Sequence, residues 1–163
     1  LIAVVMIAGI SNKMNAQATA RATATAIIVA PITIVNAADM NFGNVAVILA
    51  GTVVLTPAST RTKTGGVTLP VTAGTVTAAS FTVGGSGSYT YAITLPTTDY
   101  TITRASGTET MAVNTFTSTP SGTGALTTGA QTLNVGATLN VGAAQVAGTY
   151  TNATGFDVTV NYN

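Results

Sequence analysis

The sequence predicts an all-β domain, built as a sandwich or barrel of short strands. Thr, Val, Ile, Tyr and Phe dominate the chain, Gly and Pro recur between the apolar runs, and several runs alternate apolar with polar residues. This composition and this period of two are typical of strands rather than helices. Short strands at such spacing favour a sandwich or barrel. The 163 residues suffice for one domain with a hydrophobic core.

The first element, residues 1–18, has the features of a signal peptide. Residues 1–10 are apolar or small, and Ala16-Gln17-Ala18 matches the small-x-small cleavage pattern. Ten residues are about half of what a membrane-spanning helix needs. No initiator Met or basic region precedes the run, so we expect a signal peptide truncated at its N-terminus and cleaved after Ala18. A buried strand or helix is the alternative interpretation of this run.

The next element, residues 19–30, is predicted to be a long strand with one apolar face. Every even position from 20 to 34 is apolar, beginning with Ala20, Ala22, Ala24, Ala26 and Ile28. Ile27 and Val29 add apolar side chains on the other face, which indicates burial on both faces near the end of the segment. Pro31 has no N–H for a ladder, so it divides this segment from a first intramolecular strand at 32–35.

An extended segment of this length reaches about 40 Å and would aggregate if left unpaired. It must therefore dock on its own domain or on a neighbouring molecule.

The remaining elements are short strands separated by turn residues. We expect them at 45–49, 52–56, 66–69, 75–83, 88–95, 100–104, 111–118, 131–135, 138–141 and 155–162. The strand ending at Val83 and the strand 88–95 flank a Gly-rich turn, which predicts a hairpin. The duplicated TLNVGA unit at 132–143 is too short for a solenoid, so its glycines are interpreted as turns or bulges in consecutive strands.

Composition argues against most site chemistry. The chain has no His and no Cys, and Asp39, Asp99, Glu109 and Asp157 are its four carboxylates. A Ser-His-Asp triad, a thiolate nucleophile and a typical zinc site all lack their residues. We therefore expect no enzymatic activity, no catalytic residues, no metal and no cofactor. A net charge of +1 likewise predicts no nucleic-acid partner.

Two polar stretches receive structural interpretations. The stretch 39–44 partly matches a calcium loop, but its spacing fails and no bidentate Glu follows, so a turn is predicted. Arg61 and Lys63 are expected at a solvated hairpin tip.

The chain ends in a second alternating segment. Apolar residues at Phe156, Val158, Val160 and Tyr162 alternate with polar ones, which predicts a half-buried terminal strand with its apolar face inward.

An alternating terminal strand with a penultimate tyrosine resembles the C-terminal signature of chaperone–usher fimbrial subunits. The closing stretch VGAAQVAGTYTNATGFDVTVNY and the opening PITIVNAADMNFGNV resemble secreted pilin-like domains related to spore coat protein U. The resemblance implies an immunoglobulin-like, pilin-like β-sandwich that lacks one strand and is completed by a donor strand from the next subunit. Residues 19–30 would be that donor strand, 31–163 the sandwich, and the C-terminal segment would line the groove that accepts the donor.

The resulting expectation is a structural subunit of an extracellular bacterial filament. The subunit would form a homopolymer at the cell surface and have no stable membrane span in its mature form, with a periplasmic chaperone and an outer-membrane usher as further partners. The alternative is a self-complemented secreted coat or surface protein, or a carbohydrate-binding domain. A carbohydrate-binding domain needs an exposed aromatic patch, for which the candidates are Tyr89, Tyr91, Tyr100 and Tyr150. The alternation of Tyr89 and Tyr91 with threonines favours the core for both.

Overall fold

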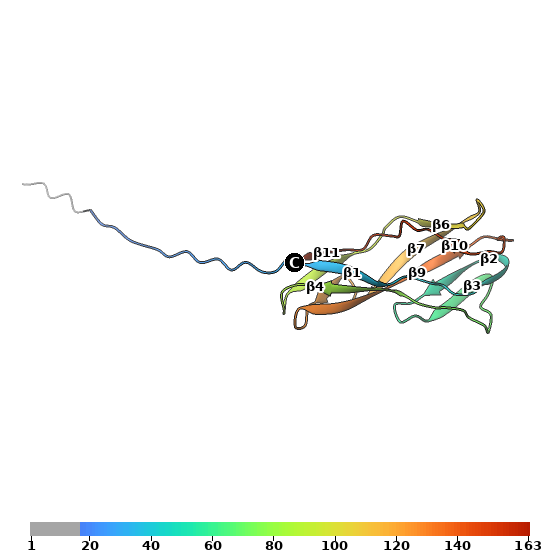
Figure 1. Cartoon of the computed structure of the whole chain (residues 1–163), viewed down its shortest axis with the longest axis horizontal. Helices are drawn as coiled ribbons and strands as arrows, with labels where there is room; N and C mark the ends of the chain where they lie inside the picture. The colour runs from blue at the N-terminus through green and yellow to red at the C-terminus, as the bar shows by residue number, and fades with distance from the viewer. Residues whose placement is uncertain (1–16) are drawn as a thin grey trace, which may run out of the picture.

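The computed structural model describes residues 17–163, which form an all-β, sandwich-like fold of curled antiparallel sheets with an extended N-terminal segment (Figure 1). Its strands are β1 (Thr33–Ala38), β2 (Ala46–Leu55), β3 (Arg61–Thr68), β4 (Ala79–Gly84), β5 (Thr90–Thr94), β6 (Tyr100–Arg104), β7 (Thr110–Thr119), β8 (Thr123–Ala125), β9 (Ala130–Val141), β10 (Tyr150–Thr151) and β11 (Thr159–Tyr162). Over residues 17–163 there is no helix that could span a membrane. All but the last two residues of the expected signal peptide lie outside the described part.

Strand β9 organises the larger sheet. One of its edges pairs with β4 over its first half and with β2 over its second half, and its other edge pairs with β7. The strand order in the larger sheet is β1-β4-β9-β7-β6-β10, and β2 pairs with both β9 and β3. The smaller sheet has the order β11-β5-β8. Ala130 pairs with Gly84, the partner of Thr33, and Val141 pairs with Gly51. Strand β9 thus runs from the end of the domain that carries the N-terminal segment to the opposite end.

The duplicated unit forms one strand, where the sequence predicted two with turns or bulges at their glycines. Gly136 lies inside β9, and a Cβ there would come within 2.2 Å of the Leu55 carbonyl oxygen. Glycine is needed for this close approach of two backbones. The bulge lies in the partner strand instead, because the β7–β9 register shifts between Asn114 and Thr117, where Thr115 has φ of 49°.

Strand β2 also joins two predicted strands. Its register with β3 shifts between Val47 and Gly51, and this bulge leaves Ile48 and Leu49 79% and 65% exposed.

The hairpin predicted around the Gly-rich turn is wrong. Strand β4 pairs with β1 and β9, whereas β5 pairs with β11 and β8. The connection after Gly84, which has Ser88 at φ of 69°, crosses from one sheet to the other. This crossing places the Tyr91 ring in the core, where it is fully buried against Leu133 and Val135 of the larger sheet. The free energy gained by burying the ring exceeds what a local hairpin turn would contribute.

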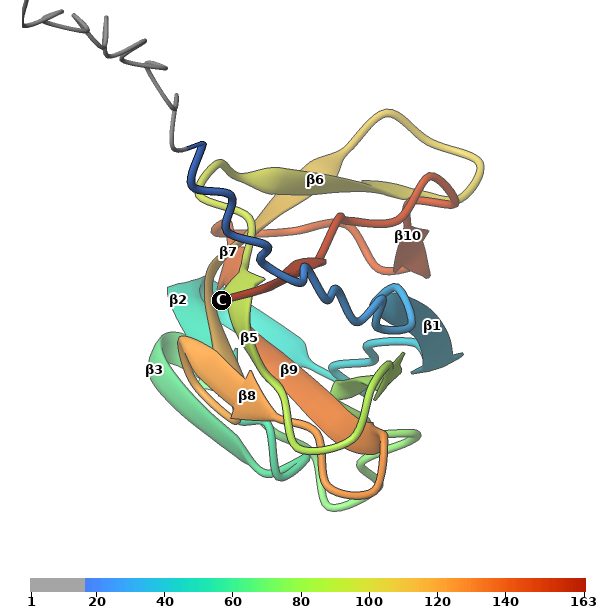
Figure 2. The same cartoon turned by 90° about the vertical axis from the view of Figure 1, so that its left-hand side faces the viewer.

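The core consists of two clusters along the long axis. The cluster near the N-terminal segment contains Tyr91, Leu133 and Val160, and the other contains Val53, Val113 and Leu139. The half-buried Met40 and Phe116 pack against both clusters and connect them. Viewed along the long axis, the two sheets curl around this core (Figure 2).

Arg61 is not at a hairpin tip. The β2–β3 turn is formed by residues 56–60, and Lys63 pairs with Val53 inside the ladder. The Arg61 guanidinium donates to the carbonyl oxygens of Phe42 and Asn44. The predicted turn at 39–44 is present, with the Gly43 N–H donating to Asn41 Oδ1 at 2.8 Å, so Arg61 fixes this turn against β3.

Candidate functional site

The segment 17–30 extends away from the sandwich and belongs to no strand (Figure 1). Ile27 and Ile28 are 86% and 97% exposed, and Val29 is half-buried where the segment meets the domain. The other predicted donor residues, Ala20, Ala22, Ala24 and Ala26, are also exposed. From Ala20 to Ile28 the alternating apolar face therefore has no partner among residues 17–163.

Ala30 is held by hydrogen bonds to two distant parts of the chain. Its N–H donates to Ser86 Oγ at 3.0 Å, and its carbonyl oxygen accepts from the Tyr162 hydroxyl at 3.0 Å. The same hydroxyl accepts from the Ser86 N–H at 2.7 Å. We call these three bonds the Ala30 clamp. The clamp ties the base of the segment to the β4–β5 connection and to the C-terminal strand.

The C-terminal segment alternates as the sequence predicts. Val160 is buried, and Phe156, Val158 and Tyr162 are half-buried, while the residues between them are exposed. The paired strand is shorter than predicted, because β11 covers only 159–162. All four apolar residues pack on the cluster around Tyr91. This set meets the predicted donor segment only at its base, through Tyr162 and Ala30.

Two sheet edges are unpaired beside this segment. Within residues 17–163, β1 pairs only with β4 and β11 pairs only with β5. The two strands belong to different sheets yet lie close to each other at the end that carries the N-terminal segment (Figure 1). Each presents a row of backbone N–H and C=O groups that an added strand could use.

A cleft of about 1190 Å³ continues from these edges toward the opposite end of the domain. One wall is the chain from Asn36 to Val47, and the other is the segment 145–156 between β9 and β11. Its floor contains core side chains, among them Val113, Leu139 and Val141. The cleft thus reaches the second core cluster, although the three named floor residues are each at most 5% exposed.

The wall 145–156 is attached to β6. Strand β10 pairs with residues 103–104 of β6, the Tyr100 hydroxyl donates to the Asn152 carbonyl oxygen at 2.8 Å, and Asn152 Nδ2 donates to the Thr101 carbonyl oxygen at 2.8 Å. No hydrogen bond among the described residues joins this wall to the wall 36–47. The two walls are therefore held by separate parts of the domain and not by each other.

Arg104 packs against the same wall at Gly148. Its guanidinium forms a two-bond ion pair with Glu109 at 2.7 and 3.2 Å. The hydrogen bond from Arg104 is the main reason that the pKa of Glu109 falls from 4.5 to about 2. The stem of Arg104 packs under Gly148, where a Cβ would lie 2.9 Å from Cδ.

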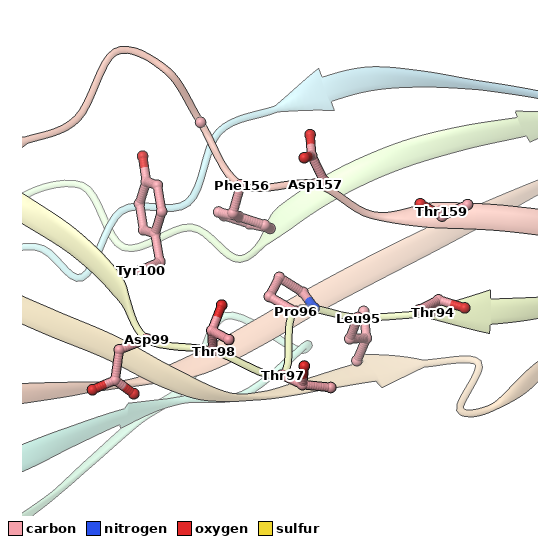
Figure 3. Close-up of a pocket in the computed structure, with 11 residues that line it drawn as sticks. Thr94, Leu95, Pro96, Thr97, Thr98, Asp99, Tyr100, Phe156, Asp157 and Thr159 are labelled. Carbon is pink, nitrogen blue, oxygen red and sulfur yellow. The ribbon is translucent and has the colours of Figure 1, made fainter.

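A smaller pocket of about 440 Å³ lies where β5 and β11 separate (Figure 3). The two strands pair from Thr94 and Thr159 onward, and beyond that point Pro96 and Phe156 line the gap. Asp99 and Asp157 border this pocket, but Figure 3 shows their carboxylates pointing away from each other. The Asp99 carboxylate also accepts from Asn114 Nδ2 at 3.0 Å. Among residues 17–163 no group of three or more potential metal ligands gathers.

The four candidate tyrosines do not form one exposed aromatic patch. Tyr91 is fully buried, as predicted, whereas Tyr89 is 45% exposed, which contradicts its predicted place in the core. Tyr100 packs edge-on against Phe156 with the ring centroids 5.7 Å apart. The Tyr150 hydroxyl donates to the Val146 carbonyl oxygen at 2.7 Å. Tyr89 lies against the Tyr162 ring at 5.6 Å, next to the Ala30 clamp.

Ser86 and the two walls of the cleft could not be predicted as parts of the site from sequence patterns. Ser86 lies in a Gly-rich turn, where serine is ordinary and carries no separate signal. The walls are mostly irregular chain, and their position depends on contacts between residues far apart in sequence, such as Arg61 with Phe42. Tyr162 was the residue from which a part of the site could be predicted, because a penultimate tyrosine in an alternating strand indicated that the C-terminal strand belongs to it.

Comparison with known proteins places the sandwich in a family. No curated protein and no solved structure matches the chain. A family model matches residues 32–162, beginning two residues after the Ala30 clamp. The chain thus belongs to the family described as a domain of unknown function, DUF4402.

Proposed function

We propose that this protein is a structural subunit of an extracellular bacterial filament, in which the N-terminal segment of one subunit completes the sandwich of the next. One observation carries the proposal. The segment 19–30 has an apolar face that is exposed up to Ile28 and meets its own domain only at Val29 and Ala30, while among residues 17–163 the edges of β1 and β11 beside it are unpaired and a cleft lies over the core.

Burial of the free segment would stabilise such an assembly. Ile27 and Ile28 are almost fully exposed, and burying an isoleucine side chain contributes roughly 1.5–3 kcal/mol. The alanines on the same face add roughly 0.8 kcal/mol for each CH₂-sized group. The alanines therefore contribute little burial energy each, and the isoleucines near the base of the segment supply the main apolar anchor.

The dimensions of the segment fit the acceptor. Strand β9 has 12 residues and runs from one end of the domain to the other, and 19–29, which precedes the clamped Ala30, has about the same length. Both therefore extend about 40 Å. An added strand between β1 and β11 could pair with both edges and cover the cleft, which is β-strand addition in the sense of donor-strand complementation.

The resemblance to chaperone–usher fimbrial subunits supports the same proposal. It implies an immunoglobulin-like sandwich with one strand missing, export to the cell surface, and passage through a chaperone and an usher. The inward-facing Phe156, Val158, Val160 and Tyr162 occupy the positions that would line the groove in such a subunit. Neither the proposed polymer nor the proposed complementation requires a cofactor or catalytic group.

Assembly of the purified mature chain tests the proposal. Residues 19–163 should form filaments visible by electron microscopy and ladders that resist SDS. Deletion of 19–29 should abolish both. Filaments formed by the truncated chain would refute the proposal, and a stable full-length monomer with its segment folded back would support a self-complemented coat or surface domain instead.

A matched pair of point variants tests whether assembly depends on the apolar face of the segment, since neither variant changes the length of the segment. Ile28→Asp places a charge on the predicted inserted face, and Thr25→Asp places the same charge on the opposite face. Both positions are exposed in the free chain, so the fold of the monomer should be unchanged in each. Ile28→Asp should suppress assembly much more than Thr25→Asp, and equal effects would argue against insertion of this face.

A further inference from the structure

We infer that the Ala30 clamp directs the N-terminal segment away from its own cleft and so commits it to a second copy of this chain. This inference rests on the proposed function and decides between two dockings that the sequence leaves open. The clamp consists of three bonds, from Ala30 N–H to Ser86 Oγ, from Ser86 N–H to the Tyr162 hydroxyl, and from that hydroxyl to the Ala30 carbonyl.

Gly85 makes room for the clamp. A Cβ at Gly85 would lie 2.2 Å from the Tyr162 hydroxyl oxygen and 3.0 Å from Leu126 Cδ1. Any larger residue would displace the hydroxyl from the position where it bonds both Ser86 and Ala30. The neighbouring Tyr89 ring, 5.6 Å from the Tyr162 ring, restricts the tyrosine on another side. The hydroxyl is therefore positioned by packing as well as by its own bonds.

Return of the segment to its own cleft requires a reversal of the chain at the clamp. The segment would have to run back along β1, antiparallel to it, with a tight turn near Ala30 and Pro31. The favoured two-residue hairpin turns need positive φ at their first position, but proline is fixed near −65° and the residue before it favours extended backbone. Both backbone groups of Ala30 are also already bonded in the outward conformation.

A turn placed earlier in the segment does not remove this obstacle. Such a turn would have to use Ile27, Ile28 and Val29, which have the largest apolar side chains of the segment. The part left for insertion would then consist mainly of alanine and threonine. Docking in the same molecule would thus lose the main anchor, whereas a second copy can accept the segment at full length.

Crosslinking with introduced cysteines distinguishes the two dockings, because the chain has no cysteine of its own. Thr25→Cys on the segment, at an exposed position outside the predicted apolar face, and Asn36→Cys at the cleft wall, in one full-length chain, can be joined by a flexible bis-maleimide that tolerates small register differences. The parent double variant should give ladders of subunits joined to one another. Each single-cysteine chain serves as a control for products that do not join the two sites.

The clamp variants are then added to this double-cysteine chain. Tyr162→Phe removes two of the three bonds and keeps the ring, and Ser86→Ala removes only the acceptor for the Ala30 N–H. Loss of two modest hydrogen bonds should raise the ratio of intramolecular to intermolecular product about tenfold. Ser86→Ala should give a smaller rise, and Tyr89→Phe, which removes a neighbouring hydroxyl outside the clamp, should behave as the parent.

The outcomes separate the two proposals. If the parent forms ladders and both clamp variants keep the parental ratio, the role of the clamp is refuted while the filament proposal stands. If the parent gives only intramolecular product, the segment docks on its own domain and both proposals are refuted. Ser86→Ala keeps the test decisive even if Tyr162→Phe fails to fold.

Discussion

At the residue scale, small residues create the space for buried aromatic side chains. Tyr91 is fully buried, its hydroxyl donates to Gln131 Oε1 at 2.7 Å, and burial raises the pKa of that hydroxyl. Gly124 pairs with Tyr91 in the smaller sheet, and a Cβ at Gly124 would lie 2.2 Å from Tyr91 Cζ. The ring and the glycine therefore form one packing unit.

Gly124→Ala should destabilise the domain by about 1–3 kcal/mol, because the buried ring has to leave its position or the strands have to separate. Urea unfolding measures the change. Gly142→Ala is the matched control, since its Cβ would meet only the end of the Gln145 side chain, at 3.1 Å. An equal loss of stability in both variants would contradict the packing explanation.

Glu109 gives the stability of the domain a dependence on pH. The hydrogen bond from Arg104, followed by one from its own backbone N–H, lowers the pKa of the Glu109 carboxyl from 4.5 to about 2. A carboxyl with a lowered pKa in the folded state stabilises the fold above its unfolded pKa and loses this contribution as the pH falls through the folded value. The stability difference between the parent and Glu109→Gln should therefore be constant above about pH 5 and disappear toward pH 2.

Because both side chains of this ion pair remain partly in contact with solvent, which screens the interaction, the difference should be small. Thermal unfolding at a series of pH values measures it. The same Glu109→Gln change made in an Arg104→Gln background should show little of the pH dependence. A full dependence there would mean that Arg104 is not its cause.

At the element scale, β9 is the strand on which the fold depends most. It pairs with β2, β4 and β7 and contributes Leu133, Val135 and Leu139 to the core. Its residues alternate inward and outward except at Gly136, where the backbone of Leu55 comes close. Loss of packing in β9 therefore affects both core clusters.

Leu133→Ala should cost about 2–5 kcal/mol, because a fully buried leucine is replaced and a cavity remains. Thr132→Ala, the adjacent and exposed position on the same strand, should change stability by less than about 1 kcal/mol. Denaturant unfolding of the two variants checks this, and a loss at Thr132 comparable to that at Leu133 would contradict the assigned facing of β9.

The elements also indicate what local sequence patterns can predict. The all-β class, β6 at 100–104 and the alternation at the C-terminus follow from residue period and turn composition, and the structure confirms each of them. The short strands β8 and β10 were missed because Gly124 and the neighbours of Tyr150 give no alternating run. Their pairing is determined by tertiary contacts, namely Tyr91 against Gly124 and β6 against residues 150–151.

The same limit applies to the candidate site. The apolar face of 19–30 and the inward side chains of the last strand could be predicted from alternation alone. The cleft could not, because its walls are mostly irregular chain positioned by Arg61 and by Asn152 from distant parts of the sequence. The hairpin prediction was wrong for a related reason, since the burial of Tyr91 moved β5 into the other sheet.

At the scale of the whole molecule, the distribution of charge predicts how assembly responds to salt. Charged residues are 6% of the chain and the net charge is +1, so long-range repulsion or attraction between subunits is weak. The proposed contact consists of apolar side chains and backbone hydrogen bonds, and Arg21 is the one charged residue in 19–30. Such a contact is little screened by ionic strength, whereas salts that strengthen apolar burial should favour it.

Filament yield should therefore stay nearly constant between low and moderately high sodium chloride and rise in ammonium sulfate at equal ionic strength. Sedimentation of polymer at fixed protein concentration measures the yield, and Arg21→Gln provides a control for the single charge of the segment. A steep fall of yield with sodium chloride in the parent, removed in Arg21→Gln, would mean that an ionic contact rather than the apolar face joins the subunits.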